Sequence, residues 1–454
     1  MIDTVALKRI ILNLAISGKL SERKKTDSPV SEKLKLYYPN NRNELNDIPN
    51  EWKYCKFGDV LINRDSERIP ISITDRKKLS KVYNYYGASG VIDKVDKYLF
   101  SEKLLLIGED GANLISRNVP IAFIADGKYW VNNHAHVLGA TEYIVLEYAE
   151  IAINAISLVP YVTGSAQPKL SQNMMNKIAL PIPPIEEQQR IVNRVKQIFN
   201  ILDNIDKLQE NYNYNLNVLK NKVIDAGVQG KLTEQLLEDG NAEDLYDEIQ
   251  KEKSKLIEEG KIKKEKNKSE STDDEIPFEI PDNWKWVRLG DLSSKISSGN
   301  TPAGGKKAKV YVEQGYCFFR EQNIYNDGIH EEGLVYITEE LLNTRVNSTV
   351  LPKDILLNIT GGSIGRCALI PDDFTKGSVN QHILIIRMVD PRLSFFVHSY
   401  LCSPQGQKYI KGNSVGDKDG FSATRCKNML IPLPPIEEQN RIVTNLNAFL
   451  NCIN

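Results

Sequence analysis

Two histidines and two aspartates are the residues of this chain that most directly suggest chemistry. His134 and His136 stand close together in the run Asn-Asn-His-Ala-His, and Asp372-Asp373 follows a proline. Histidine pairs occur in metal sites, and carboxylate pairs occur in metal-dependent nucleases. We interpret the histidines as ordinary residues of a β-strand and the aspartates as a surface turn, so neither pair predicts a metal site.

Phosphate-binding and methyl-transfer motifs are missing from the sequence. The Gly-Lys pairs at 18–19 and 230–231 are followed by Leu and lack the upstream glycine of a phosphate loop. There is no G-x-G-x-x-G motif, and no Asn-Pro-Pro-aromatic tetrad of the kind that amino-methyltransferases use. The six cysteines stand singly, so their spacing predicts neither a zinc site nor a disulfide framework. We therefore expect no catalytic site, metal ion or cofactor in this chain.

The overall composition is that of an ordinary globular protein. Hydrophobic residues make up 41% and charged residues 26%, and the formal net charge is −1. Near-neutrality does not exclude a nucleic-acid partner, because a local concentration of Lys and Arg is sufficient. No apolar run is long enough to cross a membrane, so we expect no membrane partner and a cytoplasmic location.

Polar candidate residues concentrate in two stretches, 48–182 and 280–433, which we name domain 1 and domain 2. Both contain short runs of Val, Ile, Tyr and Phe bounded by Gly, Asn and Asp, a pattern typical of β-strands joined by tight turns. Asp126-Gly127 lies between two such runs and predicts a hairpin. We expect each domain to be mainly β or α+β.

A helix of about 44 residues, roughly 65 Å long, is predicted to begin after Pro183-Pro184. Apolar residues recur in it at 4-3 spacing, interrupted at Gln209, which is typical of a coiled coil. The same spacing continues from the C-terminal segment into the N-terminal segment. The predicted seam consists of Ile191, Val195, Ile198, Leu202, Ile205, Tyr212, Leu216, Leu219 and Val223, with Ile442, Leu446, Phe449, Ile453, Leu7, Ile11 and Leu14 in the counterpart.

Three pairs of segments repeat in cyclic order: 48–60 with 280–292, 178–195 with 429–446, and 219–232 with 7–20. The chain reads as a ring of two units cut inside one helix. We predict an α+β fold with a pseudo-twofold cyclic repeat, in which a long antiparallel coiled coil separates the two domains and the termini stack end to end. A plain tandem duplication with an unrelated N-terminal helix is the alternative. Residues 183–232 form the central helix. The second helix is divided, with its proximal half at 434–454 and its distal half at 1–22. A connector spans 23–47, and a charged connector spans 233–279.

This arrangement resembles the specificity (S) subunit of type I restriction–modification systems. The resemblance rests on LKRIILNLAISGKL, both Ile-Pro-x-x-Trp segments, the EEGKIKKEK connector and both PPIEEQ helices, in their cyclic order along the chain. It implies a non-catalytic chain whose two target-recognition domains each read one half of a split target in double-stranded DNA. It also implies that the helices dock two modification (methyltransferase) subunits, which carry S-adenosylmethionine, and that restriction subunits, which use ATP, join this core.

Candidate DNA contacts are the polar side chains in loop-like places. Asn and Gln can bond adenine, Arg can bond guanine, and Lys and Ser can hold phosphates. Turn formation or burial in the sheet is the competing role for each Asn and Ser. The candidates are Glu109, Asp110, Asn113, Arg117, Asn132, Asn133, His134, Ser165, Gln167 and Lys169 in domain 1, and Arg320, Gln322, Asn323, Thr360, Ser363, Arg366, Asn380, Gln381, His382 and Lys418 in domain 2.

Two other functions remain open at this stage. A coiled-coil scaffold without sequence-specific DNA binding would show no sequence preference when assembled with its methyltransferase. An enzyme with an unfamiliar active site would methylate DNA by itself.

Overall fold

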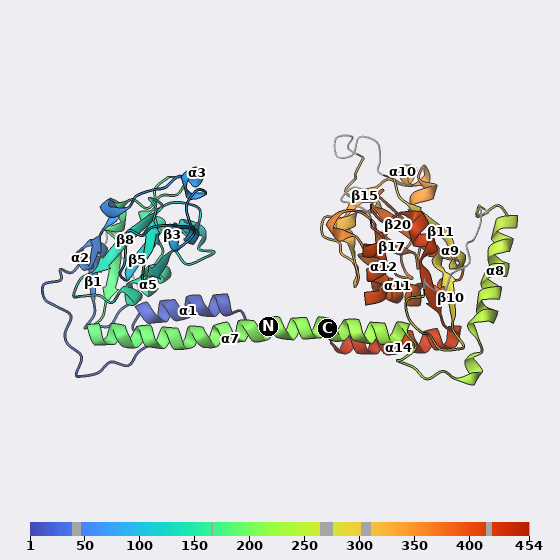
Figure 1. The fold of residues 1–454 in the computed structure, drawn as a ribbon, viewed down its shortest axis with the longest axis horizontal. Helices are drawn as coiled ribbons and strands as arrows, with labels where there is room; N and C mark the ends of the chain where they lie inside the picture. The colour runs from blue at the N-terminus through green and yellow to red at the C-terminus, as the bar shows by residue number, and fades with distance from the viewer. Residues whose placement is uncertain (39–46, 165–166, 264–275, 301–309, 415–419, 454) are drawn as a thin grey trace. The chain divides into compact units, whose positions relative to one another are not determined.

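The computed structural model describes residues 1–38, 47–164, 167–263, 276–300, 310–414 and 420–453 (Figure 1). These residues divide into two compact units, Met1–Asn211 and Tyr212–Asn454, each considered by itself. The division falls inside one helix, α7 (Ile185–Val228), whose 44 residues match the predicted central helix.

Unit 1 is built on a four-stranded antiparallel sheet in the order β2-β8-β5-β6. Its central strand β5 (Leu104–Gly108) is buried along its whole length, which explains its unbroken apolar sequence. Leu105 and Ile107 pack toward helix α5 (Leu146–Ala155), whereas Leu104 and Leu106 pack against Phe100 and Tyr129 on the opposite face. The other strands of this sheet are β2 (Leu61–Asn63), β6 (Ala122–Ala125) and β8 (Ala135–Ala140).

A second, three-stranded sheet in the order β4-β3-β7 covers that opposite face. Its strands are β3 (Tyr83–Gly87), β4 (Gly90–Val95) and β7 (Tyr129–Val131). The predicted hairpin at Asp126-Gly127 is wrong, because β6 pairs with β5 while β7 pairs in parallel with β3. The turn carries the chain from one layer to the other, and the burial of Tyr129 and Val131 between the layers outweighs local pairing.

Short elements complete domain 1. Its first and last strands, β1 (Lys53–Lys56) and β9 (Ala179–Ile182), pair with each other antiparallel. The remaining helices are α2 (Phe57–Val60), η2 (Asp65–Glu67), α3 (Ile73–Arg76), α4 (Asn113–Ser116), η3 (Val159–Tyr161) and α6 (Gln172–Met175).

Unit 2 repeats this plan. Its sheet β11-β20-β17-β18 corresponds to that of unit 1, with α11 (Ser394–Cys402) packed on one face and a sheet in the order β15-β12-β19-β16 on the other. The strands are β10 (Lys285–Arg288), β11 (Ser293–Ser298), β12 (Tyr316–Phe319), β13 (Ile324–Tyr325), β14 (Gly328–Ile329), β15 (Val335–Ile337), β16 (Thr349–Val350), β17 (Ile355–Asn358), β18 (Cys367–Leu369), β19 (Gly377–Val379), β20 (Ile383–Met388) and β21 (Leu430–Leu433).

The helices of unit 2 lie around these sheets. Part of the charged connector forms α8 (Ala242–Glu258), whose apolar face contacts domain 2 through Leu245 and Ile249. The others are η4 (Leu237–Asp239), α9 (Leu289–Leu292), η7 (Glu321–Asn323), α10 (Glu339–Asn343), η8 (Val346–Ser348), η9 (Gly361–Ser363), η10 (Pro391–Leu393), α12 (Pro404–Gly412), α13 (Ala423–Asn428) and α14 (Ile436–Cys452).

A short helix runs antiparallel to α7 in each unit, as the repeat predicts. In unit 1, α1 (Thr4–Ile16) begins near the middle of α7, where Thr4 Oγ1 donates to Asp206 at 2.5 Å and Lys8 pairs with Asp203 at 2.6 Å. Gln209 interrupts the seam because its amide bonds both the amide and the carbonyl of Ile2, at 2.6 and 3.2 Å. In unit 2, Ile442 and Leu446 of α14 pack near Gly227 at the other end of α7.

Burial along the predicted seam is uneven. Ile191, Val195 and Leu202 are buried in unit 1, and Ile442 and Leu446 are buried in unit 2. Leu7, Tyr212 and Leu219 are 37%, 63% and 44% exposed. Ile191 and Val195 belong to the core cluster of domain 1, and Ile442 and Leu446 pack with Trp284 and Phe396 in unit 2.

The junctions between α7 or α14 and the domains demonstrate the internal repeat most directly. Trp52 Nε1 donates to the buried Glu187 at 3.0 Å, and Trp284 Nε1 donates to the buried Glu438 at 2.8 Å. A second pair of contacts corresponds as well, Arg190 with Asp27 and Arg441 with Asp239, each at 2.5 Å. Gly18 and Gly230 follow the C-terminal ends of α1 and α7, with φ of 69° and 72°.

Candidate nucleic-acid interface

An Asn-x-His turn connects the two sheets of domain 1. It follows β7 and precedes β8, and it contains Asn132, Asn133 and His134. Asn132 is buried, and its Oδ1 accepts the backbone N–H of His134 at 2.8 Å. His134 is half exposed, and its Nδ1 lies 2.7 Å from Asp110, which follows β5. Burial of Asn132 thus fixes the turn, while Asn133 and His134 point outward at the end of the sheet.

The same turn is present in domain 2 between β19 and β20. Asn380 is buried, and its Oδ1 accepts the backbone N–H of His382 at 3.1 Å. His382 Nδ1 lies 2.8 Å from Thr360 Oγ1, and Thr360 follows β17 as Asp110 follows β5. Gln381 takes the place of Asn133 and is exposed. The same Asn-x-His turn therefore exposes a different amide side chain in each domain.

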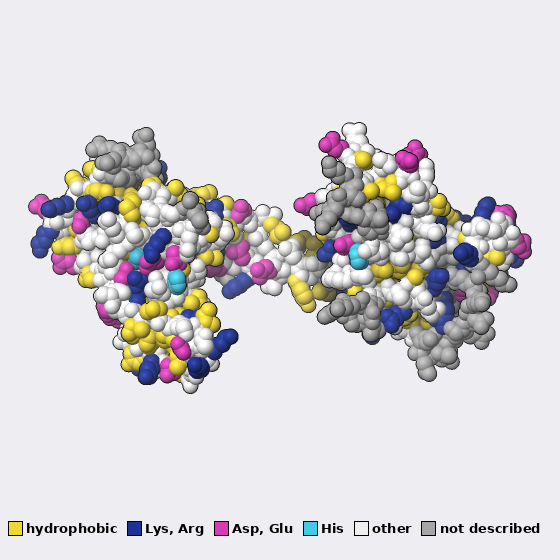
Figure 2. All heavy atoms as spheres, turned by 90° about the horizontal axis from the view of Figure 1, so that it is seen from above, with side chains coloured by type: hydrophobic (Ala, Val, Ile, Leu, Met, Phe, Trp, Pro, Cys, Tyr) yellow, Lys and Arg dark blue, Asp and Glu magenta, His cyan; other side chains and the backbone are white. Residues whose placement is uncertain are grey.

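A network of charged groups surrounds the turn of domain 1, and Figure 2 shows basic, acidic and His side chains gathered on one face of this domain. Glu109 bonds Arg68 at 2.8 Å and Lys169 at 3.2 Å. Burial raises the pKa of Glu109, but the hydrogen bond from Arg68 and the neighbouring positive groups outweigh it, and the pKa is lowered overall. The Lys169 side chain is 54% exposed and lies beside His134 and Asp110. Its ammonium group can therefore contact a phosphate of the DNA backbone.

His136 anchors this network from inside the domain. It is 1% exposed, and its Nδ1 and Nε2 lie 2.6 Å from Asp65 and 2.8 Å from the Leu170 carbonyl. Burial raises the pKa of Asp65, but its hydrogen bond with His136 acts more strongly in the opposite direction, together with other contacts, so the pKa is lowered. His134 and His136 thus have separate carboxylate partners, and we interpret His136 as structural.

The corresponding surface of domain 2 contains two arginines. The Arg366 guanidinium lies 4.4 Å from the centre of the Tyr325 ring, which stacks on His330. Arg320 donates to the Gly333 carbonyl, next to the exposed Gln322. Glu321 accepts from Asn380 at 2.7 Å, which connects this loop to the Asn-x-His turn. Stacked Arg side chains and nearby amides are the groups that bond base edges in nucleic-acid complexes.

Several candidates from the sequence are engaged in hydrogen bonds within the domains. Arg117 has a positive φ of 50° and donates to carbonyls at the end of α5, including that of Ile156 at 2.8 Å, and burial lowers its pKa to about 10. Asn113 bonds both the N–H and the carbonyl of Val119. Asn323 is fully buried and donates to the His330 carbonyl at 2.9 Å. Together with Asn132 and Asn380, these side chains hold loops in place, so they are not part of the candidate surface.

The remaining candidates lie at the surface or at its border. The structure brings together Glu109, Asp110, Asn133, His134 and Lys169 in domain 1, and Arg320, Gln322, Thr360, Ser363, Arg366, Gln381 and His382 in domain 2. Gln167 is exposed two residues before Lys169. Ser165 and Lys418 lie outside the described residues. Sequence reasoning missed Arg68, since nothing in its local sequence separates it from the other charged residues of 64–68. The exposed Asp372 pairs with Lys353 at 3.3 Å, in agreement with the surface turn that we predicted.

Comparison with known proteins decides the family. The model of the family described as "Type I restriction modification DNA specificity domain" matches residues 49–212 and 281–454. The chain belongs to this family. The two matched regions each contain one Asn-x-His turn, so the repeat found in the structure coincides with two copies of the family domain.

Relatives named as specificity subunits are similar to the chain at low identity. The type I restriction enzyme EcoAI specificity subunit of Escherichia coli is 24% identical over 345 residues, which cover 64% of this chain and 56% of the relative. The type I restriction enzyme MjaVIII specificity subunit of Methanocaldococcus jannaschii is 22% identical over 423 residues, which cover 89% of this chain and 88% of the relative. The matched region therefore spans little more than half of the Escherichia coli relative.

A solved structure supports the fold. A chain from a study of complex assembly and conformational transition in the type I R-M system matches with a TM-score of 0.56 and 16% sequence identity, covering 89% of this chain and 91% of that one. Among the described residues of the present protein, no helix combines the length and apolar character needed to span a bilayer.

Proposed function

We propose that this chain is the DNA-reading specificity subunit of a type I restriction–modification complex. Domain 1 reads one half of a bipartite target in double-stranded DNA, and domain 2 reads the other. The observation that carries this proposal is the Asn-x-His turn, which recurs at the same place in both domains with Asn133 in one and Gln381 in the other. Recognition of two different half-sites requires different side chains at equivalent positions of the two domains.

The chemistry of these surfaces suits base recognition. An amide side chain can donate and accept at the same time, and so can pair with adenine in the major groove at about 1–3 kcal/mol of discrimination. Lys169 and Arg366 supply positive charge beside the turns, for phosphate or guanine contact. Because one domain reads few bases, two domains on one helix increase the total discrimination and fix the gap between the half-sites.

Exposed apolar side chains on the helices suit partner proteins. On α7, Ile201 and Leu208 in unit 1 are 59% and 67% exposed, and Tyr212 and Tyr214 in unit 2 are 63% and 68% exposed. Tyrosine is enriched at the centres of protein interfaces. We infer that each unit docks one modification subunit, that restriction subunits join this core, and that S-adenosylmethionine and ATP are bound by those partners. The complex acts on DNA in the cytoplasm, and this chain contributes recognition without catalysis.

Selection of bound duplexes from a random pool tests the proposal. The chain is assembled with its modification subunits, and retained DNA is sequenced. We expect two short motifs at a fixed distance. Asn133→Ala should relax preference in one motif, by about 5- to 150-fold at a base, and Gln381→Ala should do so in the other. Retained DNA without any shared motif would favour a coiled-coil scaffold instead.

A further inference from the structure

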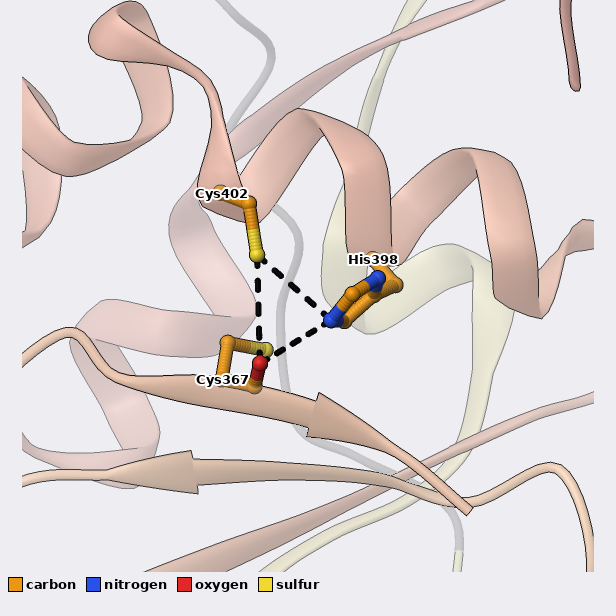
Figure 3. Close-up of side chains that lie close together, drawn as sticks. All are labelled: Cys367, His398 and Cys402. Carbon is orange, nitrogen blue, oxygen red and sulfur yellow. Dashed lines mark hydrogen bonds between the residues drawn. The ribbon is translucent and has the colours of Figure 1, made fainter. Parts of the chain in front are cut away.

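Two cysteines and a histidine meet on the face of the domain 2 sheet that α11 covers (Figure 3). Cys367 lies on β18 and is fully buried, while His398 and Cys402 lie one helical turn apart on α11. The potential ligand atoms of the three side chains all lie within 4.8 Å of one another. None of the three side chains belongs to the Asn-x-His turn, and the proposed DNA reading assigns a role to none of them, although Arg366 directly precedes Cys367.

The distances within the cluster approach those of a tetrahedral zinc site. Zinc–sulfur and zinc–nitrogen bonds of about 2.3 and 2.0 Å at tetrahedral angles place S and N about 3.5 Å apart. Cys402 Sγ and His398 Nε2 are 3.5 Å apart. The Cys367 carbonyl oxygen is 2.9 Å from Nε2 and 3.9 Å from the Cys402 sulfur, so an oxygen donor borders the same space.

Domain 1 shows what this place contains when the thiols are absent. Ile107 of β5 pairs with Ala122, as Leu357 of β17 pairs with Cys367, so Ala122 is the counterpart of Cys367. Asn154 stands as far after His134 as Cys402 stands after His382. Asn154 Nδ2 donates to the Ala122 carbonyl at 2.8 Å. An amide therefore satisfies in domain 1 the carbonyl that the His–Cys pair approaches in domain 2.

A buried cysteine is ordinarily a small apolar residue of the core, and Cys55 and Cys426 fit that description. The cluster differs because two thiols and an imidazole from two elements converge. It also differs because the equivalent positions of domain 1 are occupied by Ala and Asn. Packing and carbonyl satisfaction by themselves require neither thiol.

We propose that Cys367, His398 and Cys402 bind a zinc ion, with the Cys367 carbonyl as a fourth ligand, and that the ion ties α11 to β18. Both thiols lose their protons to solvent on binding. The neutral imidazole of His398 moves its proton from Nε2 to Nδ1, so Nε2 gives up its hydrogen bond to the Cys367 carbonyl and binds the metal through its lone pair. Thiolate and imidazole ligands select zinc over magnesium or calcium, so the ion is structural and distinct from any cation that the DNA carries.

The full-length protein, reduced and stripped of metal, provides the test. Titration with Co²⁺ should give one equivalent of thiolate-to-cobalt charge-transfer absorption, which Zn²⁺ then removes. Competition with a chromophoric chelator measures the affinity for Zn²⁺. Cys402→Ser should weaken binding by more than about a hundredfold, beyond the cost of losing an outer-shell partner.

Two further variants separate binding from folding. The double variant Cys367→Ala/Cys402→Asn installs the residues of domain 1 and should keep the circular dichroism spectrum while losing the cobalt band. Cys426→Ala removes another buried thiol of domain 2 and should bind Zn²⁺ as the unmodified protein does. The proposal is overturned if reduced unmodified protein gives no cobalt–thiolate band, or if Cys402→Ser and the double variant bind Zn²⁺ with unchanged affinity.

Discussion

Replacement of Glu187 or Glu438 by alanine should destabilise the corresponding unit by about the same amount. Both carboxylates are fully buried where a helix meets a globular domain. Glu187 accepts from Trp52 at 3.0 Å and Ser21 at 2.8 Å, and Glu438 accepts from Trp284 and Gln235, both at 2.8 Å. Hydrogen bonds to a charged group contribute about 1.5–3 kcal/mol each, and the orphaned indole N–H adds a desolvation cost. The replacement also removes the cost of burying the carboxylate, which offsets part of this destabilisation. We expect a net decrease of about 3–4 kcal/mol in the free energy of unfolding.

Chemical denaturation, followed by the fluorescence of the tryptophans, measures both losses. Glu186→Ala is the matched control, since Glu186 lies in the same turn, is exposed and accepts from Ser28, so its replacement should change the stability far less. A cycle with Trp52→Phe should give a coupling energy of about 1–3 kcal/mol between Trp52 and Glu187. If Glu187→Ala cost no more than the control while Glu438→Ala cost several kcal/mol, the equivalence of the two junctions would be refuted.

Two further predictions concern spacing and pH. Inserting four helix-forming residues after Glu210 lengthens α7 by about 6 Å and should change the gap between the half-sites while leaving the half-sites themselves unchanged. Sequencing of methylated sites measures the gap, and a change in the recognised bases would contradict the spacer role. Burial, followed by the nearby charge of Glu147, raises the pKa of Glu150 to about 7. The folded state therefore holds this proton more tightly than the unfolded state, and stability falls as pH rises from the ordinary value of 4.5 to about 7. Glu150→Gln should raise the melting temperature of unit 1 at pH 8, with a gain that shrinks toward pH 4.5; an equal gain at both pH values would contradict this origin.

The long helix and the repeat could be predicted because local signals encode them. Two prolines followed by two glutamates define the start of α7, and 4-3 spacing defines its apolar stripe. The cyclic order of repeated segments predicts that α1 and α14 contact α7 in the same way. Exposure along the stripe could not be predicted, because it depends on whether a domain also covers the helix at Tyr212 or Leu219.

The candidate surface was predictable in type and less so in position. Asn132 and Asn133 are neighbours of the same type, yet the former holds the turn and the latter faces solvent. Arg117 satisfies the carbonyls of a helix end that is distant in sequence, which no local pattern reveals. The pairing of β7 with β3 likewise depends on a second layer of the domain. The thiol cluster joins residues of two separate elements, and its one local signal is the spacing of His398 and Cys402 on one face of a helix.

Methylation mapping in a host that expresses the complete system tests the central claim most directly. Residues 48–182 are exchanged for the same domain of another family member, and the modified positions are identified by single-molecule sequencing. The account predicts that one half-site changes while the other half-site and the gap remain the same. A change in both half-sites, or an unchanged target, would contradict the assignment of one half-site to each domain.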